Sequence, residues 1–153
     1  MPHSPNQNSI NVSTRSAANS SNKKAISAHP RSSADPYELK EFYLGVKAFN
    51  NSDYPKAHHI WEHSWMRQRE DADRAYLKPF IMLAVSFQNY ELGKFSGGDY
   101  LFETALKRLN QSSTTLDQWI DADLLIKQIQ KSIANNKWIH RLENLKIKKR
   151  KTL

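Results

Sequence analysis

The segment from Phe49 to Trp65 holds the end of one helix, a turn and the start of a second helix. Asn50 and Asn51 suit the end of a helix, Asp53 can cap the next one, and Pro55 suits its first turn. Because so short a turn leaves two helices side by side and antiparallel, this segment predicts a helical hairpin.

Apolar side chains on both sides of the turn recur with the spacing of an α-helix. Before the turn they occupy positions i, i+3, i+4, i+7 and i+10, and after it positions i, i+3, i+4, i+7 and i+11. The first stripe is Leu39, Phe42, Tyr43, Val46 and Phe49, and the second is Tyr54, Ala57, His58, Trp61 and Trp65. We expect the first helix to begin at Asp35-Pro36 and to end at Asn50-Asn51.

Three more helices are expected after a charged loop at residues 68–73. The central one begins near Pro79, stops at Gly93 and is apolar on two faces, which is typical of the buried centre of a bundle. The fourth ends in the polar run 110–115, and Asp121 caps the fifth. Their stripes are Leu101, Phe102, Ala105 and Leu109, then Ala122, Leu125, Ile126, Ile129 and Ile133.

The chain therefore predicts an all-α fold without strands. The second pair of helices weakly repeats the first, with Trp61 and Glu62 matching Phe102 and Glu103. We expect a compact bundle of five helices, or six if residues 137–153 form another, built from two stacked helical hairpins. Residues 35–136 would form this one domain, residues 1–34 a disordered basic tail rich in Ser and Asn, and residues 137–153 a basic C-terminal helix or tail.

Composition limits the chemistry. The chain of 153 residues has no cysteine, which excludes disulfides, thiolate metal sites and a cysteine nucleophile. No apolar run is long enough to cross a bilayer, so we expect a soluble, cytoplasmic protein; the Ser-rich, acid-free residues 1–34 leave organelle targeting as an alternative. The net charge of +8 resides in the two tails, and residues 35–136 carry a net charge of −2.

His58 and Glu62 are the candidate catalytic residues. At i and i+4 on one helix, both lie at the edge of the buried stripe, where Glu62 can orient the imidazole. They would be a base and its partner, two ligands of a metal ion, or a polar pair that only anchors the hairpin. His59 and His63 fall on the outer, solvated side of the same helix.

A family resemblance appears at these residues. Its positions are Phe49-Asn50, Asp53-Tyr54, Ala57-His58, Trp61-Glu62 and Trp65, followed by Ile81, Leu83-Ala84, Gly93 and Ala105-Leu106. They resemble the domain-of-unknown-function 309 family, which is small and all-helical, over about Leu39 to Ile133. The resemblance implies that His58 and Glu62 face a pocket shared with a His and a Gln from the central helix. Here those positions are Asn89 and Met82, and the Glu expected beside the first His is His59.

We expect Trp61, Trp65, Met82 and Asn89 to line a binding pocket beside the His58–Glu62 pair. At the other end of the domain, Lys and Arg follow a stripe formed by Trp138, Leu142 and Leu145, which suggests a surface for nucleic acid or another anionic partner. Its candidate residues are Arg141, Lys146, Lys148, Lys149, Arg150 and Lys151.

Three functions remain open from the sequence. The first is a noncatalytic helical interaction module that binds a protein, without a cofactor. The second is a metal-dependent or acid/base hydrolase-like enzyme that uses His58 and Glu62. The third is nucleic-acid binding through the basic tails, which added salt would weaken steeply.

Overall fold

The computed structural model describes residues 36–135, 141 and 143–150. The predicted disorder of residues 1–34 lies outside this range, as do Trp138, Leu142 and Lys151. The described helices are α2 (Pro36–Asn50), α3 (Tyr54–Arg67), α4 (Asp71–Arg74), the 3₁₀ helix η1 (Ala75–Leu77), α5 (Lys78–Glu91), α6 (Phe95–Leu116) and α7 (Ala122–Asn135). No helix in these ranges is long and apolar enough to span a membrane.

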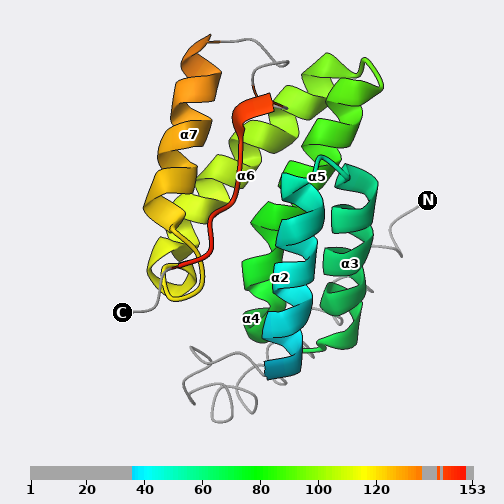
Figure 1. Cartoon of the computed structure of the whole chain (residues 1–153), viewed down its shortest axis with the longest axis vertical. Coiled ribbons are helices and arrows are strands. Elements are labelled where there is room, and N and C mark those ends of the chain that lie inside the picture. The colour runs from blue at the N-terminus through cyan, green and yellow to red at the C-terminus, as the bar shows by residue number, and fades with distance from the viewer. Residues whose placement is uncertain (1–35, 136–140, 142, 151–153) are drawn as a thin grey trace, which may run out of the picture. The chain divides into compact units, whose positions relative to one another are not determined.

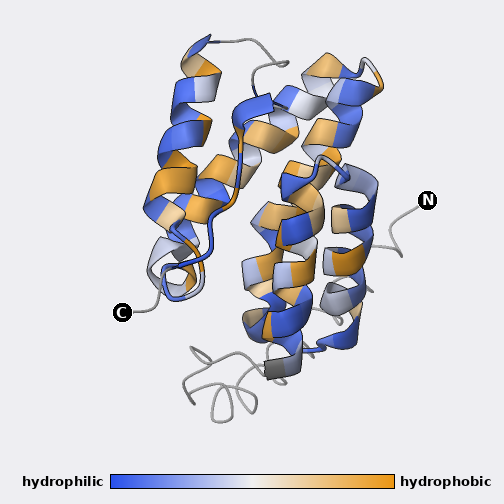
Figure 2. Ribbon diagram, in the orientation of Figure 1, coloured by the Kyte–Doolittle hydropathy of each residue, from blue (hydrophilic) through white to orange (hydrophobic). Residues whose placement is uncertain are grey.

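The helices form two stacked hairpins, as predicted. Helix α2 packs against α3, α5 packs against α6, and α3 joins the hairpins by packing on α5 (Figure 1). Helix α7 then packs on α6. Apolar residues face the inside of this arrangement and polar residues the outside (Figure 2). The all-α fold is confirmed, and the described part of the chain contains no strand beyond one isolated bridge between Ile120 and Lys149.

Aromatic rings fill the space between the hairpins. The ring of Phe42 lies 4.9 Å from that of Phe80, and the ring of Phe49 lies 5.2 Å from that of Phe87, so α2 and α5 meet through edge-to-face and tilted contacts. Trp61 is fully buried between them and donates from Nε1 to the carbonyl oxygen of Phe42 at 3.1 Å. The two predicted apolar stripes therefore meet in one core.

A glycine allows close packing within each hairpin. A Cβ atom at Gly45 would lie 2.2 Å from the indole of Trp61, and one at Gly98 would lie 2.5 Å from the ring of Tyr90. Both distances are far below van der Waals contact. The two glycines thus leave room for the aromatic side chain of the facing helix.

The turns follow the local signals in the sequence. Asp53 caps α3 by accepting a hydrogen bond from the backbone N–H of Lys56 at 3.3 Å, and Asp121 accepts one from Leu124 at 3.0 Å. Pro79 lies in the first turn of α5, where a missing N–H costs nothing. Gly93 ends that helix with a φ of 78° in the left-handed region.

Two boundaries differ from the prediction. Helix α6 does not stop at residue 109 but continues to Leu116, because Leu116 is fully buried and extends the stripe of Leu109 by two turns. The expected loop at residues 68–73 contains the start of α4, and η1 then buries Tyr76 and Leu77. Tertiary burial of Leu116 overrides the polar character of residues 110–115, whereas α4 itself buries no side chain.

The chain returns to the core at its C-terminal end. Residues 145–150, which we call the C-terminal segment, are not helical and run between α7 and α2 (Figure 1). Leu145 and Ile147 are buried, whereas Lys148 is exposed. The side chain of Asn50 holds Ile147 by both backbone groups, accepting from its N–H at 2.8 Å and donating to its carbonyl oxygen at 2.7 Å.

Candidate functional site

His58, Glu62 and Gln88 form a small polar cluster on the surface between α3 and α5. Nδ1 of His58 lies 3.0 Å from Oε1 of Gln88, and Nε2 of His58 lies 3.5 Å from Oε2 of Glu62. The side chain of His58 is 28% exposed and that of Glu62 54% exposed. The predicted pair therefore does share one face, and it remains open to solvent.

This geometry defines what the imidazole can do. With Oε1 of Gln88 as the acceptor, Nδ1 of His58 carries a proton, and Nε2 is directed towards the Glu62 carboxylate. In the neutral imidazole Nε2 is then an acceptor, as is the carboxylate, so a proton or a cation between them is needed to join the two groups. Among the described residues, however, no group of three or more His, Cys, Asp or Glu side chains is placed to hold a metal ion. The cluster suits proton exchange or the hydrogen bonding of a ligand better than metal binding.

The four residues expected to line a pocket beside this cluster have separate surroundings. Trp61 is buried in the core. Trp65 is covered by Arg74, whose guanidinium lies 4.1 Å from the ring centre, and by the ammonium of Lys78 at 4.7 Å. Met82 packs on the core. Asn89 faces Gly97 at the start of α6, and it is its neighbour Gln88 that reaches His58.

Arg141, expected on the anionic surface, is instead only 4% exposed. Its Nη1 donates to Oδ1 of Asp99 at 2.7 Å and to the hydroxyl of Tyr90, and its Nε donates to Oγ of Ser132 at 3.0 Å. The guanidinium also lies 4.6 Å from the ring centre of Phe102. Burial and the hydrogen bond to Asp99 raise the pKa of the Tyr90 phenol, so this hydroxyl stays protonated. Arg141 therefore ties α5, α6 and α7 together.

The other described candidates for the anionic surface lie along the C-terminal segment. Lys146 donates from Nζ to the carbonyl oxygen of Asn50 at 2.9 Å, and Arg150 forms an ion pair with Asp117 at 3.1 Å. Lys148 and Lys149 are exposed. The segment thus carries its positive charges on the outside while Leu145 and Ile147 attach it to the core.

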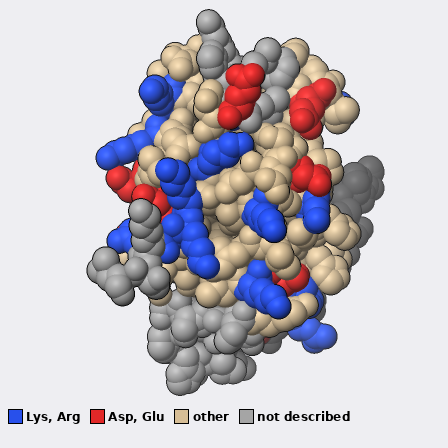
Figure 3. All heavy atoms as spheres, in the orientation of Figure 1, with Lys and Arg blue, Asp and Glu red and all other residues tan. Residues whose placement is uncertain are grey.

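The C-terminal segment and α2 together form a basic groove. It is a shallow hollow of about 510 Å³ lined by Leu39, Lys40, Tyr43, Leu44, Lys47 and Lys149. Several Lys and Arg side chains gather on this face of the molecule (Figure 3). Leu44 is 45% exposed within it, and no carboxylate is among the lining residues. The groove combines positive charge with exposed apolar surface.

Helix α2 separates its charges between two sides. Glu38 and Glu41 face α3, where both pair with Arg67 at 2.6 and 3.4 Å. Lys40 and Lys47 lie on the groove side. The acidic side chains of α2 therefore lie away from the groove and share one Arg67.

Tyr43 forms the floor of the groove. Its hydroxyl donates to the carbonyl oxygen of Trp119 at 2.9 Å, and burial raises the pKa of this phenol, which keeps it a donor. The ammonium of Lys149 lies 4.5 Å from the centre of its ring. Tyr43 thereby fixes the position of a lysine that comes from the far end of the chain.

Sequence reasoning missed Gln88 and the α2 part of the groove. The signal for the groove was present, because Lys40, Tyr43, Leu44 and Lys47 repeat at i, i+3, i+4 and i+7 beside the core stripe. The alternation of Leu145, Lys146, Ile147 and Lys148 was also a signal for an extended segment with one buried face.

Comparison with known proteins gives a match in the first part of this domain. Residues 42–101 match the model of a family described as a domain of unknown function (DUF309). Over these residues the chain is similar to the DUF309 family. The match confirms the resemblance over residues 42–101, a shorter range than the expected Leu39 to Ile133, and it includes the whole His58–Glu62–Gln88 cluster. No curated protein and no solved structure matches the chain. The DUF309 match itself names no reaction, substrate or partner.

Proposed function

We propose that this chain is a noncatalytic helical interaction module that binds an acidic, amphipathic segment of a partner protein in the basic groove. The observation that carries this proposal is the composition of the groove: three lysines from two distant parts of the chain surround the exposed side chain of Leu44. Charge complementarity would speed association, and the apolar contact would supply affinity.

The apolar content favours a protein partner over nucleic acid. Single-stranded nucleic acids are typically held by aromatic rings on which bases stack. Among the described residues that line the groove, Tyr43 alone has an aromatic ring, and the ammonium of Lys149 already lies over it. Leu39 and Leu44 offer a surface that suits aliphatic side chains instead.

The proposal can be tested with the full chain and a fluorescent acidic peptide that carries leucines at helical spacing. Fluorescence anisotropy should show saturable binding that weakens with added salt. The double variant K40E/K47E should weaken binding by about tenfold or more, because it reverses the charge of the groove. The double variant K56E/K107E makes the same change in net charge at two exposed lysines outside the groove and should leave binding intact.

The variant L44S separates the two kinds of partner. Loss of peptide binding in L44S supports a protein partner, because serine keeps the charge of the groove but removes its exposed leucine. Absence of saturable peptide binding, or equal weakening in K40E/K47E and K56E/K107E, would contradict the proposal. Binding of single-stranded RNA that depends on Lys40 and Lys47 but not on Leu44 would favour the nucleic-acid alternative.

The polar cluster supports a second candidate function, an acid/base enzyme. Gln88 provides an amide from another helix within hydrogen-bond distance of His58, which is the third group that His58 and Glu62 need for this function. In that function His58 would exchange a proton, with Gln88 and Glu62 orienting the imidazole. A screen of small ester and amide substrates tests it: turnover that is lost in H58A but retained in H59A would support an enzyme, and no turnover would reject it.

A further inference from the structure

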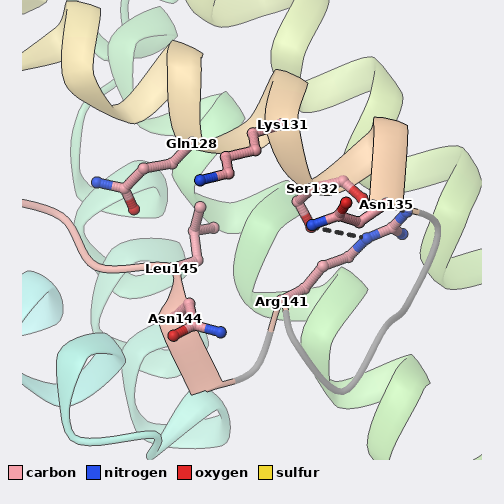
Figure 4. Close-up of a pocket in the computed structure, with 7 residues that line it drawn as sticks. All are labelled: Gln128, Lys131, Ser132, Asn135, Arg141, Asn144 and Leu145. Carbon is pink, nitrogen blue, oxygen red and sulfur yellow. Dashed lines mark hydrogen bonds between the residues drawn. The ribbon is translucent and has the colours of Figure 1, made fainter.

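A second hollow lies between α7 and the residues around Arg141, on the other side of the C-terminal segment from the basic groove. Its volume is about 360 Å³, within the usual range for a pocket that holds a small molecule. One wall is formed by side chains of α7, and Asn144 and Leu145 lie opposite them (Figure 4). The pocket is separate from both sites described above.

The described lining residues of this pocket, except Leu145, have polar side chains. Two of these described side chains, Lys131 and Arg141, are cationic, and none of them is acidic. Gln128, Asn135 and Asn144 contribute amides, while carbon atoms form about half of the exposed surface of the pocket. Such a surface suits a small organic ligand that has several oxygen acceptors and a carbon skeleton.

Arg141 is held rigidly at one end of the pocket. Its Nε and Nη1 atoms donate hydrogen bonds to Ser132 and Asp99. Among the described residues, Nη2 donates only to the carbonyl oxygen of Ser132, at 3.4 Å. Because each terminal nitrogen of a guanidinium carries two hydrogens, Nη2 retains a donor for a ligand. A rigid guanidinium loses little entropy when it binds an oxyanion.

Lys131 provides a positive charge that no carboxylate among the described residues pairs with. Asp99 already neutralises Arg141. Lys131 extends over Leu145 in the pocket (Figure 4), and no hydrogen bond or ion pair joins its ammonium to another residue that the structure describes. Lys127, one turn earlier on α7, instead forms an ion pair with Asp123 at 3.0 Å. The ammonium of Lys131 can therefore pair with a ligand, whereas that of Lys127 is already paired with Asp123.

We propose that this pocket binds a small organic anion through a carboxylate or phosphate group. Lys131 supplies the opposite charge beside Leu145, and Nη2 of Arg141 and the amide of Asn135, towards the other end of the pocket, donate hydrogen bonds to further oxygens of the ligand (Figure 4). The site is independent of the groove function proposed above, because it shares no lining residue with the groove.

The test is thermal unfolding of the full chain in sodium phosphate, sodium succinate and sodium chloride at equal ionic strength. A ligand that binds only the folded state, at about ten times its Kd, raises the unfolding midpoint by a few degrees. Phosphate also stabilises proteins nonspecifically, so the shift must be compared between variants. K131Q and N135A should lose most of the shift, and K127Q, which removes the same charge from the same helix, should retain it.

Each outcome decides the proposal. A shift with succinate alone or phosphate alone, lost in K131Q and kept in K127Q, supports the site and identifies the group recognised. An equal shift in K131Q and K127Q would show a general salt effect and overturn it, as would no shift with either anion. Arg141 is left unchanged because its loss would disturb the fold.

Discussion

The polar cluster and the basic groove differ in how the chain assembles them. His58 and Glu62 lie one turn apart on α3, and Gln88 joins them from the next long helix, all within the segment that matches DUF309. The groove takes Lys40 and Lys149 from outside that segment, on the two sides of it in the sequence. A site built from neighbouring helices can be recognised in the local sequence, whereas a site that is completed by the C-terminal segment depends on the whole fold.

The two sites should also respond differently to mutation. The cluster is partly exposed and contributes little burial, so its residues can be replaced at small cost in stability. The groove includes Lys149 only while the C-terminal segment is attached through Ile147 and Asn50, whereas the other described lining residues are on α2. Changes in that attachment should remove the C-terminal side of the groove and leave the cluster intact.

The largest effect is expected for I147A. Ile147 is 1% exposed, and truncating a buried isoleucine costs about 2–5 kcal/mol of unfolding free energy. Urea denaturation measures the loss, and peptide binding in the groove should weaken together with it. The matched control is K148A, an exposed neighbour that should change stability by less than about 0.5 kcal/mol. Equal stability of I147A and K148A would refute attachment of the segment.

A smaller effect is expected for N50A. This change removes both hydrogen bonds to the backbone of Ile147 and leaves its N–H and carbonyl oxygen without these partners, at a cost of about 1–3 kcal/mol. Hydrogen exchange at the amide of Ile147 should accelerate by the corresponding factor. Asn51 is exposed and next in the chain, so N51A serves as the control. Unchanged exchange at Ile147 in N50A would show that another group holds the segment.

The contact between His58 and Gln88 should have a modest effect. Either H58A or Q88A is expected to cost about 0.5–1.5 kcal/mol, the usual contribution of a hydrogen bond between neutral groups. A double-mutant cycle by urea denaturation should give a coupling energy of at least about 0.5 kcal/mol. If the two losses simply add, the two side chains do not interact in solution.

The smallest effect is expected for E62Q. Glu62 is 54% exposed, and exposed ion pairs contribute about 0–1 kcal/mol. The variant should therefore be as stable as the wild type within that range and should leave groove binding unchanged. A loss of more than about 2 kcal/mol in urea denaturation would mean that the cluster is structural rather than a surface site.

Local signals made most of the fold predictable. The caps at Asp53 and Asp121 and the stop at Gly93 depend only on neighbouring residues, so the sequence shows them directly. The extension of α6 to Leu116 was missed because residues 110–115 are poor helix formers in isolation and are held by the burial of Leu116.

The candidate sites were less predictable because they depend on how elements rotate and return. Asn89 and Gln88 are neighbours, and only the rotation of α5 against α3 decides that Gln88 faces His58. Arg141 has the sequence context of a solvated basic residue, yet Asp99, which is 42 residues away, makes its burial tolerable. Neither fact is contained in the local periodicity.

The two hydrogen bonds between the side chain of Asn50 and the backbone of Ile147 also restrict insertions and deletions before Ile147. Arg141 is anchored to Asp99 and Ser132, so the stretch from Arg141 to Ile147 is held at both ends. Inserting or deleting one residue there would bring a lysine to the place of Ile147 and direct its ammonium into the core. Relatives that keep both anchors should therefore conserve this spacing and vary in length beyond Arg150 instead.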